Sequence, residues 1–243
     1  MRRECSCQLF LKVLMVMALC VMSTHAAQAE VVNFPDKNLE AAVRKAINKP
    51  IGDILQTDLV RTRFTGLTAS DADIENLEGL QYCADLTLVY LPNNQVVDLR
   101  ALACLTKLET LLFGGNQIVD LRALAGLTNL KHLYLGSNQV TDVSALAGLT
   151  ALKHLDLRGN QISDISALAT NTGISYESLF HGGGVVHGGS NAIDMGNEFQ
   201  IPDKVDLRDN PLNQHALCNV ITTLKARGVD VVYDGECSGK GDG

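Results

Sequence analysis

The sequence of 243 residues contains no tryptophan, and aromatic residues make up only 5% of it. Hydrophobic residues still account for 46% of the chain, so a core must be built from aliphatic side chains. Blocks of basic residues are also absent, and 27 acidic residues outnumber 20 basic ones to give a formal charge of −7. Because binding to nucleic acid depends on Lys and Arg replacing the counterions of the phosphates, we expect no nucleic-acid partner.

Long apolar segments are absent except for one run, Val13–Met22, which is too short to span a bilayer as a stable anchor. Cations precede this run, and the small residues Ala27 and Ala29 follow it at a spacing typical of a cleavage site. We therefore predict a signal peptide over residues 1–29 and a secreted, periplasmic or cell-surface protein without stable membrane insertion after cleavage. A lipoprotein signal at Cys20 is a weaker alternative, because a bulky leucine precedes that cysteine.

Three kinds of residue recur every 22 positions through the middle of the chain. One ladder consists of Asn94, Asn116, Asn138 and Asn160. A second consists of Asp98, Asp120, Asp142 and Asp164. A third is apolar and consists of Leu91, Phe113, Leu135 and Leu157. Several ladders in one register over four units indicate a repeat architecture.

Each unit reads as one coil of a stacked structure. The stretch at residues 132–136 alternates, so it predicts a strand with Leu133 and Leu135 on its buried face. Asn138 follows where the chain turns inward, and its amide can both donate to and accept from the backbone of a buried turn. Asp142 can cap the next turn. Since one coil cannot bury its apolar face alone, we expect stacked coils joined by a parallel sheet.

The unit L-x-x-L-x-L-x-x-N-x-I/V-x-D resembles the leucine-rich repeat family, and its 22-residue length and N-Q-I/V-x-D run resemble the bacterial internalin-type subclass. The resemblance implies an α/β solenoid with a parallel sheet on its concave face and short 3-10 or irregular segments on its convex face. Helical N-terminal and helix–strand C-terminal caps complete it. The predicted layout is a helical cap (30–63), repeats (64–170), a Gly-rich insertion (171–202), the last repeat with the C-terminal cap (203–237) and a polar tail (238–243).

Four of the seven cysteines lie beyond the predicted signal peptide, and an even number in an exported chain indicates disulfides. We predict a bridge between Cys218, on the last helix, and Cys237, just beyond the last strand. Cys83 and Cys104 fall on neighbouring coils within disulfide reach, although Cys83 alone also suits the core as a small apolar side chain. The pairing of Cys83 with Cys104 therefore stays open.

Positions that the repeat leaves free form three columns on the predicted concave face. The first column is Gly66, Leu88, Thr110, His132, His154 and Lys204. The second is Thr68, Tyr90, Leu112, Tyr134, Asp156 and Asp206. The third is Ser70, Pro92, Gly114, Gly136, Arg158 and Arg208. We expect an exposed apolar strip without a role in folding, and we predict a partner site of Tyr90, Leu112, Tyr134, His132, His154, Asp156, Arg158, Asp206 and Arg208.

Catalytic and metal-binding motifs are weak. Among these, His181 and His187 lie in the Gly-rich insertion without other ligands at metal-binding spacing, and the Asp ladder lacks the clustered oxygens that calcium needs. We expect no enzyme, metal or cofactor, and a monomer that recognises a protein partner on its concave face. Two alternatives stay open: a scaffold that binds glycan or matrix at the cell surface, and a metal-dependent module that uses histidines.

Overall fold

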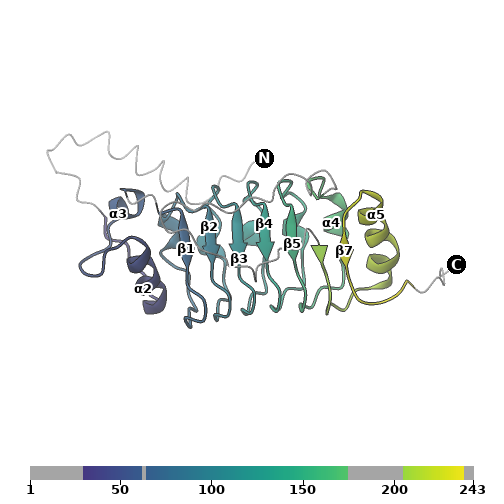
Figure 1. The fold of residues 1–243 in the computed structure, drawn as a ribbon, viewed down its shortest axis with the longest axis horizontal. Coiled ribbons are helices and arrows are strands. Elements are labelled where there is room, and N and C mark those ends of the chain that lie inside the picture. Colours follow the sequence, from purple (N-terminus) through teal and green to yellow (C-terminus); the bar gives the residue numbers. More distant parts are fainter. Residues whose placement is uncertain (1–29, 62–63, 175–204, 238–243) are drawn as a thin grey trace, which may run out of the picture.

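A computed structural model of the protein describes residues 30–61, 64–174 and 205–237. They form an elongated stack of coils with one parallel sheet of seven strands in chain order (Figure 1). The strands are β1 (Gly66–Thr68), β2 (Leu88–Tyr90), β3 (Thr110–Leu112), β4 (His132–Tyr134), β5 (His154–Asp156), β6 (Val205–Asp206) and β7 (Val231–Val232). The predicted α/β solenoid is confirmed.

Several predictions from the sequence lie outside the described residues. These are the signal peptide (1–29), most of the Gly-rich insertion with His181 and His187, Lys204 in the first column, and the polar tail (238–243). Within the part of the chain that the structure describes, no helix is long and apolar enough to cross a membrane.

The register of the sheet follows the 22-residue repeat. From β1 to β5 each residue pairs with the residue 22 positions further on, as His132 does with His154. Between β5 and β6 the step is longer, and Leu155 pairs with Val205. Because neighbouring strands are in register, equivalent side chains of successive coils stack in straight columns.

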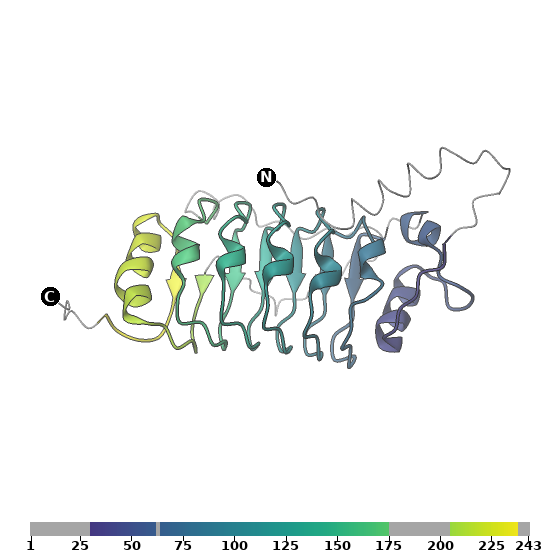
Figure 2. The ribbon, with the colours of Figure 1, turned by 180° about the vertical axis from the view of Figure 1, so that it is seen from behind.

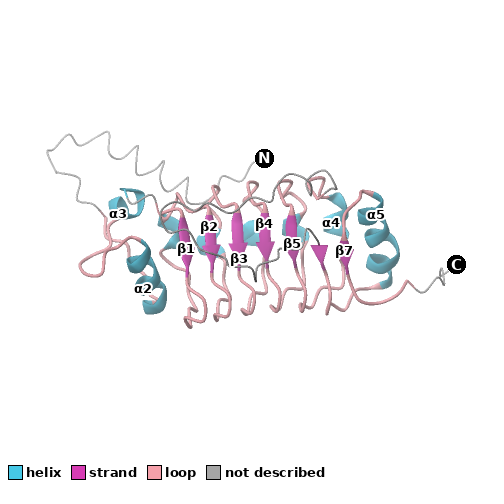
Figure 3. Ribbon diagram, in the orientation of Figure 1, coloured by secondary structure: helices cyan, strands magenta, loops and turns pink. Residues whose placement is uncertain are grey.

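Short helical segments cover the opposite face of the sheet (Figure 2, Figure 3). They are the 3-10 helices η1 (Leu80–Tyr82), η2 (Arg100–Leu102), η3 (Arg122–Leu124) and η4 (Ser144–Leu146), and the α-helix α4 (Ser166–Thr170). The Asp ladder caps four of these turns, since Oδ1 of Asp142 accepts a hydrogen bond from Ser144 N at 2.8 Å and its equivalents do the same. Leucines from every coil meet between the two faces in one aliphatic core.

The Asn ladder joins each coil to the one before it. Nδ2 of Asn138 donates to the carbonyls of Phe113 and Leu135, both at 2.9 Å, and Oδ1 accepts from Ile118 N at 3.0 Å. Asn94, Asn116, Asn160 and Asn210 make the equivalent bonds. Since these side chains are mostly buried, each one satisfies backbone groups that water cannot reach.

Helices α2 (Lys37–Ala46) and α3 (Gln56–Arg61) close the N-terminal end. Asp36 caps α2, because its Oδ1 accepts from the backbone of Asn38 and Leu39, both at 2.9 Å. Its Oδ2 accepts from the backbone of Glu75 and Asn76, at 2.7 and 3.0 Å. One carboxylate therefore both starts the helix and fastens it to the first coil.

A helix and β7 close the C-terminal end. A π-helical turn, Ala216–Val220, continues into α5 (Ile221–Ala226), which ends before Gly228. Arg227 donates to the carbonyls of Ala169, Asn171 and Ile174, so the cap is fastened to the last turn before residue 175.

The predicted Cys218–Cys237 bridge and the pairing of Cys83 with Cys104 that the sequence leaves open have different outcomes. Cys218 and Cys237 are bridged, with their Cα atoms 4.9 Å apart. Cys83 is a free thiol, so its pairing with Cys104 is wrong. The two side chains point in different directions. Cys83 takes the inward position that Leu105 has in the next coil and is only 1% exposed, whereas Cys104 lies one residue before Leu105 and is partly exposed. Burial raises the pKa of the Cys83 thiol to about 12.

Replacing Asn138 tests the Asn ladder. Asn138→Ala leaves the buried Ile118 N–H without its acceptor and removes one of the two asparagine donors to each of the Phe113 and Leu135 carbonyls, so we expect the free energy of unfolding to fall by roughly 1 to 3 kcal/mol. Urea denaturation measures the change. The control is Asn129→Ala, which removes one exposed bond to the Thr106 carbonyl and should cost under about 1 kcal/mol. Equal losses for both variants would contradict the interpretation.

The role of Asp36 predicts a pH dependence. Burial raises the pKa of this carboxyl, but four backbone N–H donors outweigh burial and hold it below its usual value of 3.8. Its contribution to stability is therefore present above pH 3.8 and is lost as the pH falls through the lower, folded value. Asp36→Ala should cost about 1 to 2 kcal/mol at neutral pH and progressively less in acid.

Asp36→Asn is the matched variant, because it keeps an acceptor oxygen but carries no charge. Urea denaturation from pH 7 into acid should show that the difference between the wild type and Asp36→Asn shrinks as the pH falls. A difference that stays constant with pH would show that the charge of Asp36 has no part in fastening the cap.

Candidate functional site

The sheet face, meaning the face of the sheet away from the helices, carries the positions that the repeat leaves free. The pairing of β1 through β6 places the first two predicted columns side by side along this face, as Tyr90↔Leu112↔Tyr134↔Asp156↔Asp206 shows. The structure therefore brings together most of the residues proposed from the sequence. Whether a partner binds them stays a prediction.

The apolar strip is buried, contrary to the expectation that it is exposed. Leu112 is 3% exposed and Tyr134 is 9% exposed, and both pack with Leu88 in a cluster separate from the main core. Tyr90 is half-buried and packs against this cluster. Side chains on neighbouring parallel strands stand about 4.8 Å apart, so each one covers the next. These residues stabilise the sheet face as well as shaping it, and alanine at Leu112 or Tyr134 would also lower stability.

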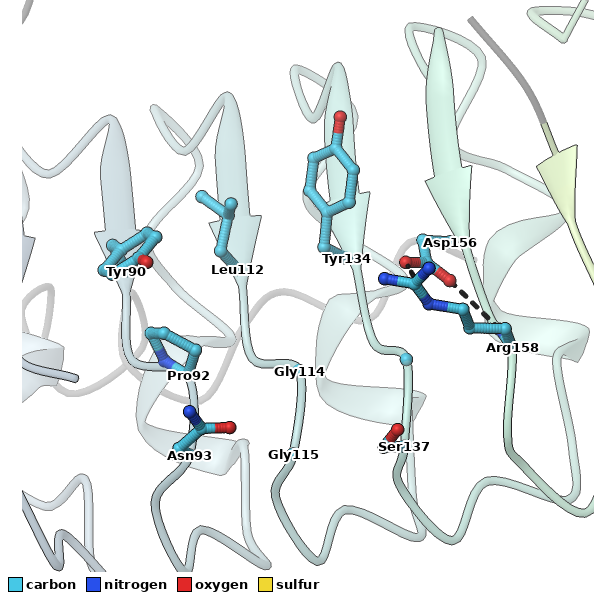
Figure 4. Close-up of a pocket in the computed structure, with 11 residues that line it drawn as sticks. Tyr90, Pro92, Asn93, Leu112, Gly114, Gly115, Tyr134, Ser137, Asp156 and Arg158 are labelled. Atoms are coloured by element: carbon cyan, nitrogen blue, oxygen red, sulfur yellow. Dashed lines mark hydrogen bonds and ion pairs between the residues drawn. The ribbon is translucent and has the colours of Figure 1, made fainter. Parts of the chain in front are cut away.

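A hollow of about 310 Å³ lies beside this cluster, at the ends of β2 to β5 (Figure 4). Its lining includes Gly114 and Gly136 from the third column, where the lack of side chains leaves the space open. Pro92 borders one end, and Asp156 with Arg158 borders the other. The sequence carries a trace of the hollow, because two glycines stand together in a column of otherwise larger residues. This pattern alone does not predict a hollow.

Asp156 and Arg158 form an ion pair at the edge of the hollow. Nε of Arg158 lies 3.2 Å from Oδ2 of Asp156, and the backbone N–H of Arg158 donates to Oδ1 at 3.1 Å. Burial raises the pKa of Asp156, and the hydrogen bond and charge of Arg158 only partly offset that effect. A Cβ atom on Gly136 would stand 3.2 Å from both carboxylate oxygens, so the carboxylate occupies the space that this glycine leaves.

The next strand carries a second pair, Asp206 with Arg208. Here the guanidinium uses both Nε, at 3.0 Å from Oδ1, and Nη2, at 2.6 Å from Oδ2. Burial raises the pKa of Asp206, but the hydrogen bonds and charge of Arg208 outweigh burial, so the net shift is downward. Two acidic and two basic side chains thus stand side by side on adjacent strands.

Two histidines of the first column lie on β4 and β5. The rings of His132 and His154 stack with centroids 4.7 Å apart and planes 12° from parallel. Burial, and then the neighbouring His154, lower the pKa of His132 to about 4, so His132 is neutral at pH 7. Within residues 30–61, 64–174 and 205–237, no three His, Cys, Asp or Glu side chains are grouped to hold a metal ion.

Comparison with known proteins identifies related structures. The model of the family described as Leucine Rich repeats (2 copies) matches residues 128–170. No curated protein matches the chain in sequence. The structure is similar to that of the internalin InlF of Listeria monocytogenes, with 26% sequence identity and a TM-score of 0.61. The matched region covers 86% of this chain and 59% of the internalin chain. The chain therefore spans less than two thirds of the length of that internalin.

Two further structures match. Internalin C2 of Listeria monocytogenes is 25% identical over 87% of this chain and 100% of that one, with a TM-score of 0.41. A leucine-rich repeat protein of Leptospira interrogans is 16% identical, with a TM-score of 0.54, over 75% of this chain and 40% of that one. The Leptospira protein shows a shared fold alone.

The role of Gly136 beside the Asp156 carboxylate can be tested by adding a single methyl group. Gly136→Ala should push the Asp156 carboxylate and Arg158 away, and we expect a loss of about 1 to 3 kcal/mol in the free energy of unfolding. Gly148→Ala is the control, since a Cβ there meets nothing within 4 Å. Urea denaturation should show the loss for Gly136→Ala alone, and equal stability of the two variants would show that the carboxylate does not depend on this space.

Proposed function

From the similarity of this chain to internalin-like leucine-rich repeat proteins, we propose that it is an exported protein that recognises a protein partner through its sheet face. Leucine-rich repeats are typical scaffolds for protein–protein interaction, and stacked coils present an extended surface for binding. The internalin-like relatives are binding scaffolds rather than enzymes.

The observation that carries the proposal is the hollow beside the apolar cluster. Folding requires the ladders of Asn, Asp and Leu, but it does not require a glycine at position 114, where a Cβ would meet no atom closer than 3.5 Å. A concave, partly apolar site with a few charged groups at its edge has the composition of a recognition site. Leu112 and Tyr134 form its rigid apolar wall, because they are already packed before a partner arrives.

Export is supported by the bridge between Cys218 and Cys237. Disulfides persist in oxidising compartments and are rare in reducing ones. The similarity to the internalin InlF supports an extracellular or cell-surface location in the same way.

Filling the hollow tests the proposed function. A Cβ on Gly114 would meet no atom closer than the Gly136 carbonyl oxygen at 3.5 Å, so a side chain can begin there without a clash and Gly114→Leu should fill the hollow. The immobilised full chain is incubated with an extract of secreted and cell-surface proteins, and retained proteins are quantified by mass spectrometry. We expect a protein that the wild type retains and Gly114→Leu loses.

Gly148→Leu is the matched control, because it adds the same side chain on the helix side of the coil where nothing lies within 4 Å. It should retain the partner as the wild type does, and thermal melting should be similar for both variants. If every retained protein binds Gly114→Leu as well as it binds Gly148→Leu, the hollow is not the recognition site.

A further inference from the structure

The Asp156–Arg158 pair at the edge of the hollow and the Asp206–Arg208 pair beside it both turn their arginine toward solvent. The side chains of Asp156 and Asp206 are only 13% and 5% exposed, whereas those of Arg158 and Arg208 are 53% and 45% exposed. The patch is formally neutral, but its carboxylates lie behind its guanidinium groups. These two pairs therefore present their cations to a partner, although Asp234 lies close enough to act on Arg208 and the chain as a whole carries a charge of −7.

The guanidinium of Arg158 retains most of its donors. It approaches Asp156 through Nε only, and within the described part of the chain its two Nη groups donate to no acceptor. Arg208, by contrast, gives both Nε and Nη2 to Asp206. A planar guanidinium with free Nη groups matches a carboxylate, which it can bind through two parallel hydrogen bonds.

The two arginines are close enough to act on one ligand. Asp156 pairs with Asp206 in the sheet, so Arg158 and Arg208, each two residues further on, are neighbours just beyond the ends of the adjacent strands β5 and β6. The backbone confirms this, since Gly159 N donates to the Arg208 carbonyl at 2.8 Å. Arg158 also lines the hollow, so the cationic patch and the apolar wall of Leu112 and Tyr134 border the same space.

We infer that this site binds an acidic segment of a protein partner, whose apolar side chain fills the hollow over Gly114 and Gly136 and whose adjacent carboxylates pair with Arg158 and Arg208. The inference rests on the proposed recognition function and names the chemistry of the partner. A basic segment fits poorly, because it would have to displace each arginine to reach the buried carboxylate behind it. Charge complementarity of this kind favours one class of partner and rejects the opposite one.

The test is a selection of displayed random peptides on the immobilised full chain, followed by sequencing of the peptides that are enriched. We expect enriched peptides that combine an apolar or aromatic residue with neighbouring Asp or Glu. Their binding should be lost on Gly114→Leu, and it should weaken as salt is raised.

The charge is tested with a double variant, Asp156→Asn with Arg158→Gln, which removes the exposed cation without leaving a bare buried carboxylate. Affinity for the enriched peptides should fall about tenfold or more, since charge-assisted hydrogen bonds are lost. The matched control is Asp120→Asn with Arg122→Gln, which removes a pair of the same spacing on the helix side of the coil. The control should bind the peptides as the wild type does.

The outcomes separate this inference from the proposed function. Two results would overturn the inference of an acidic partner and leave recognition by the hollow intact. In the first, the peptides that no longer bind Gly114→Leu are basic or neutral. In the second, those peptides bind the Asp156–Arg158 double variant as well as the wild type. A selection that yields no peptide dependent on Gly114 counts against both. Acidic apolar peptides that bind the wild type and the Asp120–Arg122 control, but not the other double variant, support the inference.

Discussion

The whole stack depends on how each coil satisfies the backbone where it turns inward. One asparagine per coil does this, and its amide reaches both its own coil and the preceding one, as Asn138 does with Leu135 and Phe113. No apolar side chain could replace it, because a buried N–H would lose its acceptor and each of two buried carbonyls would lose one of its donors. The constraint falls on a few positions in every 22, and the sheet face is free to vary.

The sequence was sufficient to predict the register, the caps and the Cys218–Cys237 bridge, because each follows from a local rule. A strict 22-residue period aligns the strands, and Asp36 begins a helix within the predicted N-terminal cap over residues 30–63. The pairing of Cys83 with Cys104 was wrong because proximity along a repeat does not give side-chain direction. The sequence also allowed Cys83 to be a small core residue, and the structure shows that alternative, a buried free thiol.

The site was harder to predict than the fold. The residues of the site could be named from the three columns of the repeat. The burial of their side chains could not be predicted, since it depends on how side chains of neighbouring strands cover one another. Leu112 and Tyr134 therefore both stabilise the sheet face and border the hollow, whereas the sequence predicted no role in folding for them. The hollow arises from side chains that are missing at Gly114 and Gly136, and a search for chemically active residues passes over such positions.

The Asn ladder also has a consequence for folding kinetics. Most of its bonds between coils close loops of 20 to 25 residues, as those of Asn138 do, so each added coil carries a similar entropic cost. Asn210 is different, because its bonds to Ile162 and Leu157 close loops of 48 and 53 residues. Each doubling of loop length costs about 0.6 kcal/mol, so we expect folding to spread through the uninterrupted coils first and the C-terminal coil to join last.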